Sequence, residues 1–533
     1  MPRTRRPRVV AADDIASLID DGMTIASEGF SMMGVAEELY AAIEHRFLET
    51  GRPRGLTWFH AAGQSDRVHG IEHLAHPGLL RRIIGTHWGL APRMSALIAA
   101  EELEAFCLPQ GQVSHLFRAG ASGEPGVITP IGLHTFLDPR QDGGKINRRA
   151  RESGDDLIEL VTIGGREYLR YLPIPFDLAI MRATTGDEDG NLSMEEEAVV
   201  LEAISIAQAA RAHGGKVAAQ VKHLAKAGTL HPKSVEVPGI LVDYLVPCSD
   251  PDRYHRQTAS YGYHPALSGE LRAPERVHTP LPMGVRKVIG RRAVLEIAPD
   301  AVVNLGTGIP GDTIGPVAAE EGTASTFVLT IESGLIGGIP LGGADFGCGF
   351  NPTAIIDHAY QFDFYTGGGL DITFMGAAEV DPTGSVNASK LNGRALGCGG
   401  FIDITQSTRK VVYLLSFTSG GLDVEASGGT LRIAREGRHR KFVDAVSQIT
   451  FNGRYARERR QEVLYITERC VLRLEEDGLT LVEIAPGIDL HTQVLAHLPA
   501  GVRVSDALGI MDPRIFTDEP MGLPIHVDPA GPA

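Results

Sequence analysis

The stretch "AVVNLGTGIPGDTIGPVAAEEG", residues 301–322, decides the fold class. Its apolar start predicts a buried strand, its glycines predict a tight turn, and the remainder predicts a helix. The earlier stretch "GMTIASEGFSMMGVAEELYAAIEHRF", residues 22–47, has the same organisation, with a strand at 23–26, a glycine turn and an apolar residue every four positions from Val35 to Phe47. Strand, glycine turn and helix in succession are typical of α/β folds with a mostly parallel sheet and helices on its faces.

The two halves of the chain also match further on. Residues 176–195 align without gaps to residues 370–389, which places Asp177 on Asp371 and Gly190 on Gly384. Each segment reads as a strand followed by an acidic turn, and we interpret the match as an internal duplication. The glycine turns of the two halves are offset by more than this alignment, so the first half carries additional residues, which we place in a segment inserted at about 55–150.

These patterns predict four parts of the chain: a first α/β domain at 1–265, a linker at 266–287 that is rich in proline and lacks periodicity, a second α/β domain at 288–515, and an extended tail at 516–533. Within the first domain, Ser193 and Glu196 have the spacing of a capping box, which predicts a helix that ends at Gly214. Residues 401–404, "FIDI", read as a strand.

Composition excludes several classes of protein. The formal net charge of −16 argues against a nucleic-acid-binding surface, so an anionic ligand has to be held by local donors. The five cysteines are odd in number and form no C-x-x-C pair, and the histidines lack metal-ligand spacing, so we expect neither disulfides nor a metal site. No apolar segment follows the arginines near the N-terminus and no run of 18 apolar residues occurs, so we expect a cytoplasmic protein without a signal peptide or membrane span.

The stretch "LTIESGLIGG", residues 329–338, places Glu332 directly after a predicted buried strand and before a turn rich in glycine. Ligands of parallel sheets collect at the carboxyl ends of the strands, so Glu332 is a candidate functional residue. The alternative is an ordinary surface glutamate at the end of a strand.

The turn "GTGIPG", residues 306–311, fits the dinucleotide fingerprint G-x-G-x-x-G, and Glu332 lies 21 residues beyond Gly311. Pro310 removes a backbone N–H that would bind a pyrophosphate, and an acidic residue that binds a ribose needs no glycine turn after it. Both features count against an NAD site.

Two further loops are candidate donors. In "LGCGGFIDI", residues 396–404, the glycines allow a ligand to approach the backbone, and successive N–H groups are suited to an oxyanion; the alternative is an ordinary tight turn. Cys398 within it is expected to be a small filler, because no basic partner is evident. In "LPQGQVSHLFRAG", residues 108–120, Gln110 is either a donor to a ligand oxygen or part of a surface turn.

These segments resemble the family I CoA-transferases, in particular the single-chain propionate/acetate CoA-transferase branch. The resemblance covers roughly residues 10–515 and includes "GFSMMGVAEEL" at 29–39, "LPQGQVSHLFRA" at 108–119, "NLGTGIP" at 304–310, "ESGLIGGIP" at 332–340 and "GCGGFIDIT" at 397–405. It implies two tandem NagB/RpiA-like α/β domains with the active site between them.

The resemblance also implies roles for individual residues. They are the catalytic nucleophile, Glu332; the oxyanion and thioester loop, Gly397, Gly399 and Gly400; a turn near coenzyme A, Gly306 and Gly308; and a loop facing the acyl group, Gly29, Phe30 and Gly34, together with Gln110. Many relatives have a proline where this chain has Ala36, a difference that bears on the acyl pocket.

The implied enzyme moves coenzyme A between short-chain carboxylic acids by a ping-pong route through a glutamyl-CoA thioester on Glu332. It holds no permanent cofactor and no metal, binds neither nucleic acid nor membrane, and forms a homo-oligomer, either dimer or tetramer. Three alternatives remain at this point: an acyl-CoA hydrolase that uses the same glutamate, an NAD-dependent dehydrogenase, and a ligand sensor on a sugar-isomerase-like scaffold. The sequence does not set the preferred acyl group.

Overall fold

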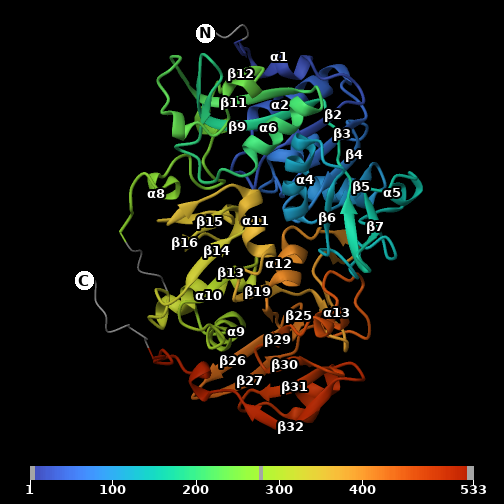
Figure 1. The fold of residues 1–533 in the computed structure, drawn as a ribbon. Coiled ribbons are helices and arrows are strands. Elements are labelled where there is room, and N and C mark those ends of the chain that lie inside the picture. The colour runs from blue at the N-terminus through green and yellow to red at the C-terminus, as the bar shows by residue number, and fades with distance from the viewer. Residues whose placement is uncertain (1–5, 275–279, 525–533) are drawn as a thin grey trace. The chain divides into compact units, whose positions relative to one another are not determined.

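The computed structural model describes residues 6–274 and 280–524 (Figure 1). The chain divides into two compact units. Unit 1 comprises Met1–Ala273, Glu332–Asp363 and Ser389–Asp403, and unit 2 comprises Pro274–Ile331, Phe364–Ala388 and Ile404–Ala533. Two segments of the second half of the sequence therefore pack with the first half. This grouping by contacts is a different division from the two homologous domains expected along the chain, and those domain boundaries stay a prediction.

Unit 1 is built on a sheet in which all strands but one pair in parallel with their neighbours. Its spatial order is β1 (Arg8–Val9), β12 (Tyr244–Pro247), β11 (Lys216–Ala225), β9 (Leu178–Asp187), β2 (Thr24–Ser27), β3 (Leu56–His60), β4 (Leu80–Gly85) and β5 (Glu104–Cys107), with β10 (Leu192–Ser193) antiparallel to β9. All ten residues of β9 are buried, as expected for a central strand covered on both faces. The helix α6 (Ala203–Ala212) lies against β9 and β11 (Figure 1).

The remaining elements of unit 1 surround this sheet. The helices are α1 (Ala12–Ser17), α2 (Glu37–Thr50), α3 (Pro92–Ala99), α4 (Gln110–Ser122), α5 (Arg148–Glu152), α7 (Pro251–Tyr254) and α8 (Pro265–Ser268). The smaller strands are β6 (Val127–Thr129), β7 (Ile158–Ile163), β8 (Arg166–Tyr171), β15 (Leu335–Ile336), β16 (Ile339–Pro340), β17 (Gly349–Phe350), β18 (Ala354–Ile355), β22 (Lys390–Leu391) and β23 (Arg394–Ala395). Helices α11 (His358–Thr366) and α12 (Phe401–Ser407) begin in unit 1 and end in unit 2.

Unit 2 has its own sheet, and helices α9 (Val285–Val294), α10 (Ile309–Glu320) and α13 (Gly453–Glu458). The sheet strands of this unit run in the order β14 (Val328–Ile331), β13 (Val302–Leu305), β19 (Ile372–Gly376), β24 (Lys410–Leu414), β29 (Glu462–Ile466), β30 (Cys470–Glu475), β31 (Gly478–Ile484) and β32 (Arg503–Ile510). Short hairpin strands complete it: β20 (Glu379–Val380), β21 (Val386–Asn387), β25 (Thr418–Ser419), β26 (Asp423–Ser427), β27 (Thr430–Arg435) and β28 (His439–Arg440).

The strand order supports the internal duplication. Five neighbouring strands run β3-β2-β9-β11-β12 in unit 1 and β14-β13-β19-β24-β29 in unit 2, in the same chain order and with the same parallel pairing. The aligned aspartates make the same bond: Asp177 accepts from the N–H of Thr24 at 2.8 Å, and Asp371 accepts from the N–H of Val302 at 2.8 Å. The predicted fold class, two α/β domains with mostly parallel sheets, is confirmed.

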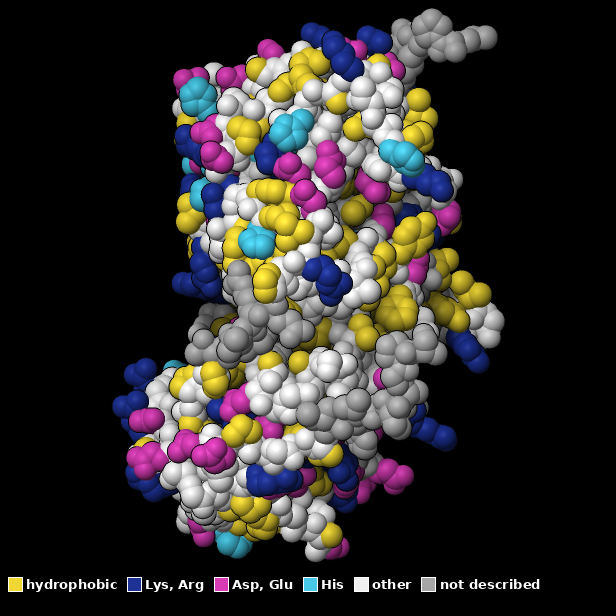
Figure 2. Space-filling view, turned by 90° about the vertical axis from the view of Figure 1, so that its left-hand side faces the viewer, with side chains coloured by type: hydrophobic (Ala, Val, Ile, Leu, Met, Phe, Trp, Pro, Cys, Tyr) yellow, Lys and Arg dark blue, Asp and Glu magenta, His cyan; other side chains and the backbone are white. Residues whose placement is uncertain are grey.

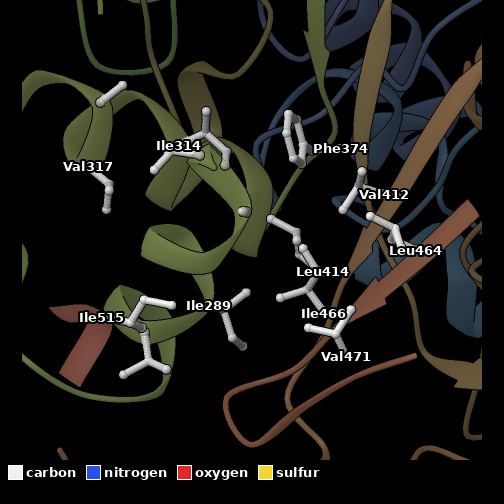
Figure 3. Close-up of a cluster of buried hydrophobic side chains, with 14 of the residues drawn as sticks. Ile289, Ile314, Val317, Phe374, Val412, Leu414, Leu464, Ile466, Val471 and Ile515 are labelled. Atoms are coloured by element: carbon white, nitrogen blue, oxygen red, sulfur yellow. The ribbon is translucent and has the colours of Figure 1, made fainter. Parts of the chain in front are cut away.

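The core of unit 2 fills the space between its helices and its sheet (Figure 3). Ile289 of α9 and Ile314 and Val317 of α10 pack with strand residues that include Phe374 and Val412, all of them fully buried. Burying one such side chain contributes about 1.5–3 kcal/mol relative to leaving it exposed.

The described part of the predicted tail also belongs to unit 2. Phe516 and Met521 are buried in its core, and the N–H groups of Met521 and Gly522 donate to the carboxylate of Glu321 at 2.9 and 3.1 Å. The tail up to residue 524 is thus packed rather than free, because it carries apolar side chains that complete the core. Residues 525–533 lie outside the described part of the chain.

Two local predictions were wrong. The predicted helix after Asn191 starts only at Ala203, because Ser193 lies in β10 and the N–H of Glu196 donates to Thr184 instead of to a capping residue. Residues 401–404 form the first turn of α12 rather than a strand; a four-residue apolar run fits either structure, and the N–H of Phe401 donates to Cys398 at 3.0 Å as a helix begins. Helices α8 and α9 overlap the two ends of the predicted linker 266–287, of which residues 275–279 are not described, and the linker stays a prediction.

Acidic and basic side chains are interspersed on the face shown in Figure 2. Across the described ranges 6–274 and 280–524, we find no helix with the length and apolar character that crossing a membrane requires.

Candidate active site

The turn that carries Glu332 is held by its neighbours in unit 1. The hydroxyl of Ser333 donates to the carbonyl of Gly347, and the carbonyl of Gly334 accepts from the N–H of Ile356 at 3.0 Å. Gly334 has a φ of 108°, and a Cβ there would lie 2.0 Å from the carbonyl oxygen of Ile356, so only glycine fits. Glu332 itself is 9% exposed. The structure therefore places a nearly buried carboxylate on a turn that a hydrogen bond and a sterically required glycine restrict.

The loop 397–400 is equally restricted. Gly397 has a φ of 81°, and a Cβ there would lie 2.2 Å from the carbonyl oxygen of Thr86. The N–H of Gly397 donates to Ser389 at 3.1 Å and that of Gly399 donates to Thr86 at 2.8 Å. Among the described residues no acceptor is found for the N–H of Gly400. Of the three glycines expected to form the loop, Gly400 is therefore the one whose N–H can meet a ligand.

Gln110 lies beside this loop and starts helix α4, where it is 3% exposed. Its N–H donates to the carbonyl of Gly399 at 3.0 Å, and its side-chain nitrogen lies 2.8 Å from Nε2 of His358. The expectation of a surface turn at this residue is wrong, because the helix buries the glutamine. The structure thus brings together Gln110 and the loop 397–400, which are far apart in the sequence.

The loop Gly29–Gly34 follows strand β2, with φ angles of 148° at Gly29 and 69° at Gly34. The ring of Phe30 packs against Phe346 and His358, with ring centroids 6.1 and 6.3 Å apart. A Cβ at Gly347 would lie 2.5 Å from the ring of Phe30, so this ring also covers the residue to which Ser333 donates. The predicted acyl-side loop is therefore a neighbour of the turn that carries Glu332.

Gly306 and Gly308 form the turn before α10 in unit 2, as the sequence predicts. The N–H of Gly306 donates to Phe374 at 2.8 Å, and Gly308 has a φ of 79° at the start of the helix. The role of this turn in binding coenzyme A stays a prediction.

Sequence reasoning missed a group of buried charges behind the Gly29 loop. Burial and the charges of Glu202 and Glu197 raise the pKa of Glu28 well above its usual range. Burial would also raise the pKa of Glu197, but the charge of Arg182 and a hydrogen bond with His255 outweigh it and lower that pKa to about 2. No spacing in the sequence marks these residues, because Glu28, Arg182 and His255 lie in segments far from one another and from Glu197 and Glu202.

A second missed group connects helices α4 and α12. Burial raises the pKa of Asp403 to about 6, against the lowering effect of the side chain of Gln112 and the N–H of Gly111, which donate to it at 2.8 and 3.2 Å. Asp403 thereby holds the start of α4, and with it Gln110, next to the loop 397–400.

The cysteines are all free in the structure, and Sγ of Cys107 lies 3.6 Å from Sγ of Cys398. Burial raises the pKa of the Cys398 thiol well above its usual value, which fits a small filler and not a nucleophile. Within residues 6–274 and 280–524, no cluster of three or more His, Cys, Asp or Glu side chains is arranged to hold a metal ion.

Comparison with known proteins gives the family. The profile described as "Coenzyme A transferase" matches residues 9–247. The chain is 43% identical over 523 residues to the acetate CoA-transferase YdiF of Escherichia coli (strain K12), which covers 97% of this chain and 96% of that protein. It is 42% identical over 522 residues to the caffeate CoA-transferase of Acetobacterium woodii, covering 97% of this chain and 98% of that one.

Solved structures agree with the sequence comparison. The apoenzyme of the acyl-CoA transferase YdiF from Escherichia coli O157:H7 superposes with a TM-score of 0.92 at 41% identity, covering 98% of this chain and 99% of that chain. A thioester complex of the same enzyme with CoA gives a TM-score of 0.91 at the same identity and the same coverage. With these relatives matched over nearly its whole length, the chain belongs to the coenzyme A transferase family and is a CoA-transferase.

Proposed function

We propose that this enzyme transfers coenzyme A between short-chain carboxylic acids and that Glu332 carries the coenzyme A in between. The observation that carries the proposal is the nearly buried carboxylate of Glu332 on a turn that Ser333 and Gly334 hold rigid. The CoA-thioester complex known for the similar YdiF enzyme supports the same chemistry.

A carboxylate suits this reaction because it becomes an acyl group of the same kind as the two substrates. Glu332 attacks the carbonyl of the acyl-CoA, and the thiolate of coenzyme A leaves, which gives a mixed anhydride. The thiolate then attacks the glutamyl carbonyl and releases the first carboxylate, which leaves a glutamyl-CoA thioester. The acceptor acid runs the same steps in reverse, so no net energy source is required.

Each of these steps passes through a tetrahedral oxyanion. In this proposal the oxyanion accepts from the N–H of Gly400 and from the side-chain amide of Gln110. Of the three glycines in the predicted loop, only Gly400 is assigned as an oxyanion donor, because the N–H groups of Gly397 and Gly399 already donate to carbonyls of unit 1. Losing one such donor typically costs on the order of 10²–10³ in rate.

The proposal is tested by incubating the protein with propionyl-CoA, reducing it with borohydride and locating the reduced residue by mass spectrometry. We expect the thioester at Glu332 to be reduced there, and we expect Glu332→Ala to show neither modification nor transfer. Modification at a different residue, or unaltered turnover by Glu332→Ala, would refute Glu332 as the carrier.

A hydrolase that uses the same glutamate is distinguished by the acceptor. We expect release of free thiol from acetyl-CoA to be slow in the absence of a carboxylate, and exchange into a labelled acetate or propionate to be fast, because closed active sites of this kind exclude water from their intermediates. Equal rates with and without the acceptor would assign the hydrolase instead. The relatives named for acetate and for caffeate differ widely in acyl size, so the same assay with both acids also measures the acyl preference.

A further inference from the structure

A chain of three buried side chains, Glu202, His358 and Gln110, leads to the loop 397–400. Oε2 of Glu202 lies 2.7 Å from Nδ1 of His358, and Nε2 of His358 lies 2.8 Å from the side-chain nitrogen of Gln110. The side chains of Glu202 and His358 are fully buried. All three belong to unit 1, and the backbone N–H of His358 is held by the carbonyl of Leu201 at 3.0 Å.

The hydrogen bonds of this chain fix its protons. The amide nitrogen of Gln110 is a donor and faces Nε2, so Nδ1 of His358 carries the hydrogen that is donated to Glu202. Nε2 of the same ring presents the lone pair that accepts one hydrogen of the Gln110 amide. Had the ring carried its hydrogen on Nε2, two donors would face each other and the glutamine amide would have to turn over. Glu202 thereby selects the tautomer, and the tautomer selects the orientation of the amide.

The amide so oriented lies at the candidate oxyanion loop. The backbone N–H of Gln110 donates to Gly399, and a Cβ on Gly399 would lie 3.5 Å from Oε1 of Gln110. His358 takes one of the two hydrogens on the side-chain nitrogen, and no other acceptor for this nitrogen is found among the described residues. The second hydrogen is therefore available to an oxygen of the substrate.

We propose that Glu202 and His358 are positioning residues that hold the Gln110 amide in one orientation beside the loop 397–400, with one hydrogen of its nitrogen on His358 and the other left for the reacting carbonyl. This inference rests on the proposed function, in which Gln110 stabilises the oxyanion. Neither residue touches the substrate in this scheme; both act through Gln110. Their contribution therefore exists only while Gln110 is present, which distinguishes a positioning role from a general structural one.

The test is a double-mutant cycle on transfer from propionyl-CoA to acetate. Asn at position 358 keeps a donor near Nδ1 and loses the acceptor at Nε2, so we expect His358→Asn to lower kcat by about 10-fold to 100-fold while KM for propionyl-CoA stays within about twofold. The side chain of Gln reaches the position of Nε2 and offers an oxygen there, so we expect His358→Gln to recover part of this loss. In a Gln110→Ala background we expect His358→Asn to change kcat by less than about twofold.

Glu202→Gln tests the tautomer. Its carboxamide can donate to Nδ1 and so permits the ring to carry hydrogen on Nε2, and we expect kcat to fall in the unaltered background but not in Gln110→Ala. A kcat for His358→Asn equal to that of the unaltered enzyme, or the same loss with and without Gln110, would overturn the proposal.

His73→Asn is the control for loss of a partly buried histidine with carboxylate partners, because the side chain of His73 binds Glu37 and Glu44 instead. We expect it to lower the melting temperature with kcat little changed. Circular dichroism of every variant identifies any that fails to fold. If His358→Asn does not fold, Glu202→Gln and His358→Gln decide the outcome. The double-mutant cycle measures transfer, whereas mass spectrometry measures the thioester at Glu332. If no thioester forms at Glu332 but His358 and Gln110 remain coupled in the cycle, the role of Glu332 as carrier fails and the positioning role of His358 stands.

Discussion

At the scale of single residues, Glu28 is held in a place where its charge is unfavourable. Burial, followed by the charges of Glu202 and Glu197, raises its pKa well above the ordinary value of 4.5. A carboxyl group with a raised folded pKa contributes stability that is complete below its unfolded pKa and is lost as pH rises through the folded pKa. Glu28→Gln removes this titration, so we expect the melting temperature of the variant to fall less than that of the unaltered protein as pH is raised from about 4.5. Thermal unfolding followed by circular dichroism over a pH series measures this; parallel pH profiles for the two proteins would contradict it.

At the scale of elements, two glycines with similar φ angles separate two costs of placing alanine there: backbone strain, and steric contact of the added Cβ with neighbouring atoms. Gly397 and Gly393 have φ angles of 81° and 76°, but a Cβ at Gly397 would lie 2.2 Å from the carbonyl oxygen of Thr86, whereas none of the described atoms lies within 4 Å of one at Gly393. Alanine at either position strains the backbone by about 1–2 kcal/mol. We expect Gly397→Ala to cost more than Gly393→Ala in the free energy of unfolding by urea, and to reduce kcat because the loop beside Gln110 has to move. Equal losses of stability and activity in the two variants would show that the contact with Thr86 does not restrict the loop.

At the scale of the whole molecule, the end of the described chain is part of a core rather than an appendage. Phe516 and Met521 are buried in unit 2, and the carboxylate of Glu321 accepts from the N–H groups of Met521 and Gly522. Since replacing a buried phenylalanine by alanine typically costs about 3–5 kcal/mol, we expect Phe516→Ala to lower the free energy of unfolding by that order. Its effect on kcat at a temperature where the variant is folded should be small by comparison. Leu523→Ala, at a partly buried position against the same core, serves as the graded control, and a variant Phe516→Ala as stable as the unaltered protein would contradict the packing role of this segment.

The sequence by itself determined the features that depend on local order along the chain. Strand, glycine turn and helix at 22–47 and 301–322 follow from periodicity and backbone freedom, and the aligned aspartates Asp177 and Asp371 marked a duplication that the strand order supports. Glu332 and the loop 397–400 were singled out from local patterns, a carboxylate after an apolar run and three glycines before one, and their roles stay a prediction. Only the tertiary structure decided which backbone N–H groups of that loop are already bound, that residues 401–404 form a helix, and that Glu202, His358 and Gln110 form one chain of hydrogen bonds. The physical reason is that a hydrogen bond between residues more than a hundred positions apart depends on how distant segments pack, and the packing of distant segments leaves no periodic signal in either segment.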